Sequence, residues 1–458
     1  MRSADRTSGP LAGAVLVAPG GGPTSRHATW LLADLGVAPA GADAGASAST
    51  IEVPCGEEVP WVASGLAPLT GRADGPPLVP VGSPSTAVGG ALLAATALAR
   101  WQGRDPDGLP GVEVLGERAA LAGYRRQGPR SLGGRFALAA TRDGWFGLSL
   151  ARDQDLELLP AFTGGDLSAE PDPFETLGAW LADRAGDELA AQARLLSLPY
   201  AVVRPPAPTG AAASSAPPWR WSVGGPTVRR GLVVDLSSLW AGPLTGHLLT
   251  QLGHEVVKVE STTRPDGARG GSRAFFDLLH AGQRAVALDL TAPAGVAQLR
   301  ALVARAELVI DGSRPRAMAR LGIDVDQVVA GGTSWLSITG HGRTGAAGMR
   351  PAFGDDAAAA GGLLAWDDQG PVPVGDAVAD PLTGAYGAVA ALACLASPRG
   401  WLVELSLARA AASAAALVGD GSAAGAPLTP PRARTPAGTA ADLGADTVAV
   451  LSELGITP

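Results

Sequence analysis

Cysteine is scarce in this sequence, and no stretch of it is both long and continuously apolar. The 458 residues include two cysteines, Cys55 and Cys394, which lie far apart and form no metal-binding pattern. Two isolated thiols favour a reducing compartment, so we expect a cytoplasmic protein. The first apolar run, Leu11–Pro19, is too short and too poorly followed by a cleavage pattern to indicate a signal peptide. No run reaches the roughly 18 apolar residues that would span a bilayer.

Charge is also low, and its balance is acidic. Charged residues make up 17% of the chain, and the net charge is −8 at pH 7. This balance argues against nucleic acid and against an anionic membrane as the main partner, although local arginines can still bind a nucleotide-like anion. With 46% hydrophobic residues, the chain can bury a large core in two or three domains.

From Gly231 onward, short apolar runs alternate with helical segments. This alternation predicts an α/β fold with a doubly wound, mostly parallel, Rossmann-like large domain, in which ligands bind at the carboxyl ends of the strands. No G-x-G-x-x-G follows the first strand, which disfavours a nicotinamide-dependent dehydrogenase. The expected strands are Leu232–Leu236, Glu255–Val259, Ala285–Leu288, Leu308–Asp311 and Trp335–Thr339, with a helix over Pro293–Arg305.

Residues 126–204 differ from this pattern and predict a small α+β domain. Ser131–Leu150 is typical of a hairpin that turns at Arg142, Asp143 and Gly144. Two helices, over Pro171–Asp183 and Glu188–Leu196, are expected before a last short strand. Residues 205–228 are expected to form a linker, because the first part is rich in Pro, Ala and Ser.

One segment, Val374–Val389, holds two carboxylates ahead of a helix of small residues. Asp380 precedes Pro381, which suits the first turn of a helix because its missing N–H costs nothing there. We therefore expect Asp380 at or beside a helix N-cap, ionised and oriented by free N–H groups. Taken alone, the segment is more typical of a capping aspartate than of a catalytic one.

The N-terminal part repeats elements of the C-terminal part in degenerate form. V-P-V-G precedes an Ala-rich helix at 79–82 and again at 372–375, and the spacing of about 290 residues recurs between Val112–Ala120 and Val403–Ala411. We expect residues 11–125 to be a copy of large-domain elements and residues 229–458 to be the large domain with its C-terminal tail. Because Thr86 stands opposite Asp380, the first copy is expected to be inactive and retained for packing.

Sequence blocks in residues Gly231–Pro458 follow the order of a known family. The matching blocks are G-L-V-V-D-L-S-S-L-W-A-G-P at Gly231, V-V-K-V-E at Val256, R-A-V-A-L-D-L-T-A-P-A-G at Arg284, A-R-L-G-I at Ala319, S-I-T-G-H-G-R-T-G at Ser337 and D-P-L-T-G at Asp380. They resemble the class III coenzyme A transferases (CaiB/BaiF type), which include formyl-CoA transferase, carnitine CoA-transferase and acyl-CoA racemases.

The resemblance implies a CoA-transferase that moves CoA from an acyl-CoA to a carboxylic acid. Asp380 matches the family nucleophile, which forms a mixed anhydride and then an enzyme thioester. Leu239, Trp240 and Ala241 match a loop that contacts the adenine end of CoA through its main chain, and Arg320 matches an arginine near the CoA phosphates. CoA is then a substrate, and neither a tightly bound cofactor nor a metal is expected. The partners would be an acyl-CoA and an acceptor acid.

Some family positions are changed, and they leave an alternative open. Ser261 replaces the usual basic residue after V-K-V-E, a loss for which Arg264 or Arg269 could compensate. Gly312 and Ser313 replace an Asn and a Phe of the family pattern. These changes favour the alternative of a non-catalytic member of the same fold, a pseudoenzyme or a subunit of a complex.

The same resemblance also bears on the racemase alternative, on two further candidate residues and on the order of the domains. The His-Asp pair of the racemases is replaced by Phe353 and Gly354, so a transferase is favoured over a racemase. Asp376 is a weaker candidate nucleophile than Asp380, and His341 is expected to be a turn residue rather than a substrate contact. The small domain precedes the large one, an arrangement that suggests a homodimer or an intramolecular pseudo-dimer.

Overall fold

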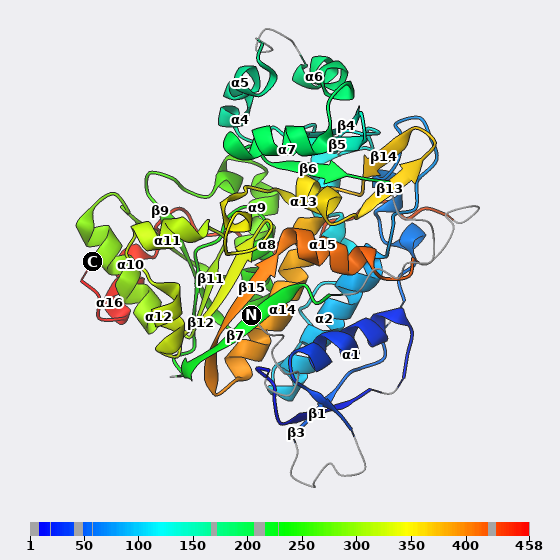
Figure 1. The fold of residues 1–458 in the computed structure, drawn as a ribbon. Helices are drawn as coiled ribbons and strands as arrows, with labels where there is room; N and C mark the ends of the chain where they lie inside the picture. Colours follow the sequence, from blue (N-terminus) through cyan, green and yellow to red (C-terminus); the bar gives the residue numbers. More distant parts are fainter. Residues whose placement is uncertain are drawn as a thin grey trace.

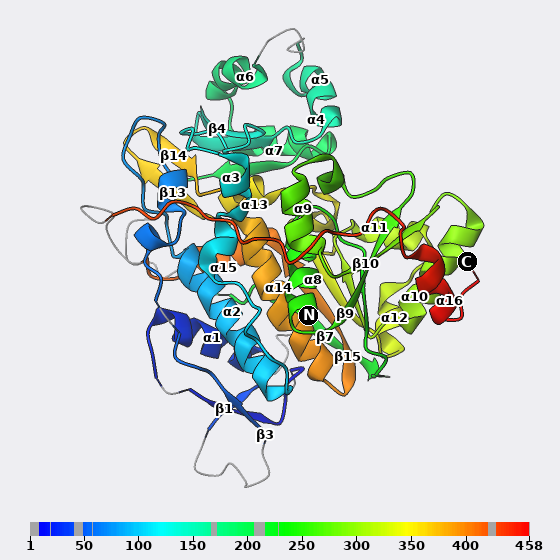
Figure 2. The ribbon, with the colours of Figure 1, turned by 180° about the vertical axis from the view of Figure 1, so that it is seen from behind.

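The computed structural model describes residues 9–18, 20–40, 49–56, 58–165, 172–205, 216–227, 229–419 and 427–457. Three parts can be followed in Figures 1 and 2: a large sheet flanked by helices, a small unit at one end of it, and an N-terminal unit packed along its long helices. The first two correspond to the predicted large α/β domain and small α+β domain.

The large sheet has seven strands in the order β10-β9-β8-β11-β12-β15-β7. Six strands are parallel, and β7 runs antiparallel to β15 at the edge. The predicted doubly wound, mostly parallel sheet is therefore confirmed. The strands are β7 (Trp219–Pro226), β8 (Leu232–Asp235), β9 (Glu255–Ser261), β10 (Arg284–Leu288), β11 (Leu308–Asp311), β12 (Ser334–Thr339) and β15 (Arg399–Ser406).

The edge strand corrects the linker predicted over residues 205–228. Trp219–Pro226 form β7, in which Trp219 pairs with Leu405 and Trp221 with Val403. The aromatic side chains explain this: Trp219 is buried in the main core, and Trp221 packs edge-on against Trp401. Residues 206–215, the centre of the Pro, Ala and Ser-rich stretch, lie outside the described residues.

Helices cover both faces of the sheet because successive side chains of a strand point to opposite faces. On β8, Val233 packs into one core and Val234 into the other. The first core includes α8 (Ala241–Gln251), α9 (Arg273–His280), α13 (Gly354–Ala360), α14 (Ala379–Ala396) and α15 (Leu407–Ala415). The second includes α10 (Pro293–Arg305), α11 (Pro315–Arg320), α12 (Val325–Ala330) and α16 (Thr447–Glu453).

Helix α14 is the centre of the first core. It is long and apolar enough to cross a membrane by length and composition, but 89% of it is buried inside the protein. That burial is typical of the core helix of a soluble fold. Small residues allow close packing: a Cβ at Gly387 would lie 2.3 Å from the hydroxyl oxygen of Thr245 on α8. The middle of α14 is thus packed closely against α8.

The small unit is an antiparallel sheet, in the order β4-β5-β6, with helices packed on it. The predicted hairpin turns at Arg142–Asp143 as expected. Phe146 stacks on Tyr200 and on Phe162 in its core. Its elements are β4 (Phe136–Thr141), β5 (Gly144–Ser149), α4 (Asp153–Glu157), α5 (Leu159–Thr163), α6 (Pro173–Ala182), α7 (Gly186–Leu195) and β6 (Tyr200–Val203).

The N-terminal unit shares its core with the large domain. Its elements are β1 (Ala14–Val17), α1 (Pro23–Asp34), β2 (Ala38–Pro39), β3 (Ser49–Glu52), α2 (Pro84–Trp101) and α3 (Glu117–Ala122). The strands form a parallel sheet in the order β2-β1-β3. Helix α2 packs against α14, and buried residues of both helices belong to one cluster (Figure 2).

Both proposed copies contain a strand, a helix and later an 18-residue helix, α2 or α14. They differ in the last matched segment, because Val112–Leu115 form a 3₁₀ turn whereas Val403 lies within β15. The internal repeat therefore stays a prediction.

Candidate active site

Two cavities meet where the strand order of the large sheet reverses. The chain passes from β8 to β9 and β10 on one side, and then returns to place β11 on the other side of β8. Loops that leave the carboxyl ends of β8 and β11 diverge at this point, which is where open α/β sheets bind ligands. The loop after β8 includes Ser238 and Leu239, and the loop after β11 includes Gly312 and Ser313. All four residues line both cavities.

The larger cavity has a volume of about 1380 Å³ and lies between the large sheet and the small unit. Leu158, Leu195 and Leu196 of the small unit form part of its wall. The smaller cavity, which we call the acid chamber, has a volume of about 220 Å³ and is lined by Asp380. Because the two cavities share lining residues, a long ligand in the larger one could extend its end into the acid chamber.

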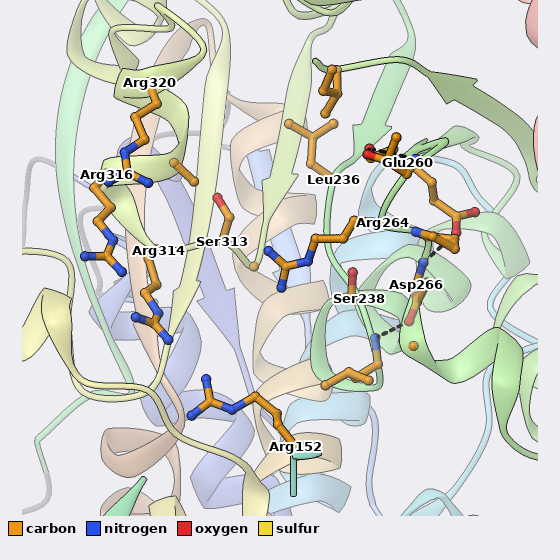
Figure 3. Close-up of a pocket in the computed structure, with 18 of the residues that line it drawn as sticks. Arg152, Leu236, Ser238, Glu260, Arg264, Asp266, Ser313, Arg314, Arg316 and Arg320 are labelled. Carbon is orange, nitrogen blue, oxygen red and sulfur yellow. Dashed lines mark hydrogen bonds between the residues drawn. The ribbon is translucent and has the colours of Figure 1, made fainter. Parts of the chain in front are cut away.

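Arginines dominate the polar lining of the larger cavity. Figure 3 shows Arg152, Arg264 and Arg314 pointing into the same space from three separate segments. Burial and the charges of neighbouring arginines, Arg152 foremost, lower the pKa of Arg314 below its usual value. Arg316 and Arg320 line the same cavity from α11 and are exposed. These arginines bring several positive charges together with few acidic partners in the cavity lining. Such an arrangement favours a ligand with several negative charges.

The loop after β8 is fixed by a buried ion pair. Lys258, the one lysine of the sequence, lies with its Nζ 2.9 Å from Asp266 Oδ2, and both side chains are 2% exposed or less. Lys258 also donates to the carbonyl of Ser237, and the amide of Leu239 donates to Asp266. Leu239 has a φ of 71°, a left-handed conformation that is strained for a leucine. The network holds this turn in place at the mouth of the cavity.

The structure separates the predicted CoA-binding residues. Leu239 lines both cavities, Arg320 lines the larger one, and Ala241 lines the acid chamber. The Trp240 side chain is buried instead, edge-on to Phe275. Main-chain contact, which the family resemblance implies for this loop, stays a prediction.

Arg264 and Arg269, the two arginines expected to compensate for the loss of a basic residue at Ser261, lie in different surroundings. Arg264 lines the larger cavity beside Ser261. Arg269 instead binds Glu260, with its Nη2 2.6 Å from Oε2.

Asp380 is the second residue of α14, two positions after the N-cap Val378, whereas we expected it at or beside the N-cap. It is partly exposed to the acid chamber. The amide of Gly354 donates to its carboxylate. The expectation that the helix terminus keeps it ionised is wrong in one respect. Burial raises the pKa of Asp380 to about 7, while Arg118 lowers it and Asp376 raises it further. A carboxylate with this pKa is a stronger nucleophile, when ionised, than an exposed aspartate.

Three acidic side chains and one arginine surround the start of α14. Arg118 binds Asp376 through two hydrogen bonds, of 2.7 Å from Nε and 2.6 Å from Nη2. Burial and the charge of Asp376 raise the pKa of Asp355 to about 7, and Asp355 accepts from the amide of Ala377. Asp376 therefore serves as the partner of Arg118, in agreement with its lower rank as a nucleophile.

Histidine makes no visible contribution to the acid chamber. His341 lies in a turn, as expected, and burial lowers its pKa to about 3. None of the described residues lining the chamber is a histidine. Within the described ranges, no group of three or more His, Cys, Asp or Glu side chains is placed to hold a metal ion.

Sequence reasoning missed three residues of this site. Arg314 was visible as part of an arginine-rich R-P-R segment, and Asp355 as part of a D-D pair, yet neither was assigned a role. Arg118 gave no signal, because its partner Asp376 is 258 residues away.

Residues 231–440 match CoA-transferase family III. This region, a little under half of the chain, is thus similar to CoA-transferase family III. The family that the sequence blocks resembled is thereby confirmed, and the matched region contains Asp380, the loop after β8 and the arginines of α11.

Known relatives of this family match part of the chain. The chain is 28% identical over 191 residues to the succinyl-CoA–D-citramalate CoA-transferase of Chloroflexus aurantiacus, a match that covers 38% of this chain and 48% of the relative. It is 30% identical over 181 residues to the succinate–glutarate CoA-transferase of Agrobacterium fabrum, covering 36% of this chain and 45% of that one. The chain thus spans about half the length of the curated relatives it matches.

A solved CAIB/BAIF family protein from Brucella suis is 28% identical, with a TM-score of 0.37, over 40% of this chain and 53% of that one.

Proposed function

We propose that this protein is a CoA-transferase in which Asp380 is the nucleophile. The observation that carries the proposal is the position of Asp380 in a small chamber that opens into an arginine-lined cavity. The cavity suits the phosphates and the long arm of an acyl-CoA, and the chamber suits the thioester end. The similarity of residues 231–440 to the family supports the same chemistry.

The reaction can be written with this chain's own groups. An oxygen of the ionised Asp380 attacks the thioester carbonyl, the C–S bond breaks, and CoA leaves as a thiolate from a mixed anhydride. The thiolate attacks the carbonyl that belongs to Asp380, giving an enzyme thioester and the free donor acid. The acceptor acid then attacks this thioester and forms a second anhydride. The thiolate returns to the acceptor carbonyl and restores Asp380.

We further propose that the substrates carry a second carboxylate. Arg152, Arg314 and Arg350 line the acid chamber, and Asp380 is the one acidic residue among its described lining residues. Arg152 is already paired with the buried Asp155, so the unbalanced positive charge is that of Arg314 and Arg350. Arg350 is partly buried, and its Nε atom makes no hydrogen bond within the described structure. A reacting carboxylate alone leaves this positive charge in excess, whereas a short dicarboxylic acid balances it. The substrates named for the relatives from Chloroflexus and Agrobacterium have this chemistry.

The nucleophile can be tested by chemical trapping. The protein is incubated with a panel of acyl-CoA esters and hydroxylamine, and its peptides are analysed by mass spectrometry. We expect a hydroxamate at Asp380 in the wild type and no adduct in Asp380→Asn. Binding of CoA esters without any adduct or transfer would contradict the proposal and favour a non-catalytic member of the family.

The second carboxylate can be tested by comparing succinyl-CoA with butyryl-CoA, which lacks it. Loss of one charge-assisted contact of about 1.5–3 kcal/mol should lower kcat/KM by about 10- to 150-fold for the wild type. The difference should shrink in Arg350→Met or Arg314→Met. Equal kcat/KM values for the two esters would contradict this part of the proposal and leave the nucleophile untouched.

A further inference from the structure

The N-terminal unit contributes a side chain to the start of α14. Helix α3 (Glu117–Ala122) lies beside α9 of the large domain (Figure 2). From there, Arg118 reaches Asp376, which lies three residues before the first residue of α14 and is 1% exposed. The two parallel hydrogen bonds fix both the direction and the distance of the guanidinium.

A contact of Arg118 itself and an ion pair of its neighbour Glu117 hold Arg118 in this position. Its guanidinium lies over the ring of Trp240, 4.7 Å from the centroid, and Trp240 directly precedes α8 in the loop at the cavity mouth. The adjacent Glu117 binds Arg434 of the C-terminal tail through Nε and Nη2, and Arg434 Nη1 lies 2.8 Å from His247 Nε2 on α8. Arg118 is therefore anchored on both sides rather than free to rotate into solvent.

Arg118 offsets the negative charges of the carboxyl groups around Asp380. Asp376 acts on Asp380 as a like charge, and the carboxyl of Asp355 on α13 is coupled to both. Arg118 acts on all three carboxyl groups with the opposite sign. Across the acid chamber, Arg152, Arg314 and Arg350 face the position of the substrate.

We infer that Arg118, supplied by the N-terminal unit, is a positioning residue for the transfer reaction. It orients Asp376, and its charge keeps Asp380 ionised for attack on the thioester. The N-terminal unit is thus part of the active centre, whereas its sequence had suggested a role in packing alone. This inference rests on the proposed function.

The two members of the ion pair give opposite predictions for the pH dependence. In Arg118→Gln, the positive charge is lost, so the acid limb of kcat/KM for an acyl-CoA should move upward by about one pH unit or more. In Asp376→Asn, the neighbouring negative charge is lost while Arg118 remains, so the acid limb should move downward. Arg118→Lys keeps the charge without the planar fork and should bring the acid limb back toward that of the wild type.

A structural ion pair would behave differently, and this distinguishes the two roles. Loss of either partner would then lower activity in the same direction, without opposite movements of the acid limb. That result, or an unchanged acid limb in both variants, would overturn the inference. If Arg118→Gln does not fold, Arg118→Lys and Asp376→Asn still decide the matter, because the downward shift in Asp376→Asn requires the charge of Arg118.

A second pair of the same geometry provides the control. Arg72 of the N-terminal unit binds Asp367 of β13 (Leu364–Asp367) through Nε and Nη2, at 2.9 and 2.7 Å. Neither residue acts on Asp380. Arg72→Gln should therefore leave the acid limb in place. Asp380→Asn tests the proposed nucleophile separately from Arg118. Residual transfer in Asp380→Asn would contradict the proposed nucleophile. An inactive Asp380→Asn, together with unmoved acid limbs in the Arg118 and Asp376 variants, would contradict the role of Arg118 alone.

Discussion

The amide of Gly354 donates to the carboxylate of Asp380, and the space between the two residues admits no side chain. A Cβ at residue 354 would lie 2.6 Å from Asp380 Oδ2 and 2.3 Å from the carbonyl oxygen of Ala377. The carbonyl belongs to the main chain and cannot swing away as a flexible side chain could. The glycine therefore allows α13 to approach the start of α14 and orient the nucleophile.

Gly354→Ala should consequently damage the active centre more than the fold. We expect kcat to fall by about 100-fold, because a displacement of the nucleophile by about 1 Å has that effect. The free energy of unfolding should fall by about 1–3 kcal/mol, as is usual for overpacking. Steady-state kinetics and urea unfolding measure the two effects. Gly178→Ala is the control, since a Cβ there meets no atom within 4 Å; equal kinetic effects of both substitutions would contradict the role of Gly354.

The Lys258–Asp266 pair should control both stability and CoA affinity. Lys258→Met leaves a buried carboxylate without its partner, which should lower the free energy of unfolding by about 3–5 kcal/mol. Because Asp266 also holds the amide of Leu239, the KM for acyl-CoA should rise. Glu453→Gln, which removes an exposed partner of Arg284, should change stability by less than about 1 kcal/mol. A Lys258→Met protein with normal stability and KM would rule out this role.

Asp356 should make stability depend on pH. It is fully buried between Ser149 and the amide of Phe353, and burial raises its pKa to about 8. The unfolded chain loses this proton near pH 3.8, so the contribution of Asp356 to stability falls as pH rises from about 4 to about 8. Asp356→Asn lacks this penalty, and its Tm should rise relative to the wild type over that range.

Comparing the wild type with Asp356→Asn separates the effect of Asp356 on the pH dependence of stability from the effect of the buried histidines. Burial lowers the pKa of His27 and His341 to about 4 and about 3, so these residues reduce stability as pH falls below 6.5. They are present in both proteins and cancel in the difference between the Tm values. A difference that stays constant from pH 4.5 to pH 8.5, measured by thermal unfolding, would contradict a raised pKa for Asp356 in the folded protein.

Arg316 should contribute to acyl-CoA binding without taking part in the chemical step. It lines the larger cavity and does not line the acid chamber. Arg316→Met should raise the KM for acyl-CoA by about fivefold with little change in kcat, because an exposed charge contributes about 1 kcal/mol. Arg305→Met, at the far end of α10, removes an arginine that donates to the carbonyl of Ala301 and should leave KM unchanged. Equal KM values in all three proteins would exclude Arg316 from the binding site.

Much of the fold could be predicted from local patterns. Leu308–Asp311 and Pro293–Arg305 begin and end where the sequence indicated, since apolar runs and an N-terminal proline mark them clearly. The short helices α4 and α5 were missed because a few turns carry little periodicity. Strand β7 was missed because it follows a Pro-rich stretch, and its partner β15 is far away in the sequence.

Some features of the candidate site follow from local sequence patterns, and others depend on tertiary packing. The sequence by itself determined the family resemblance, the place of Asp380 at the start of a helix and the candidate phosphate contact Arg320, because each is a local pattern. Tertiary structure alone decided that Arg118 meets Asp376, that Trp240 faces the core and that Asp380 has a pKa of about 7. These features depend on which distant segments pack together and exclude water, and no local sequence pattern carries that information.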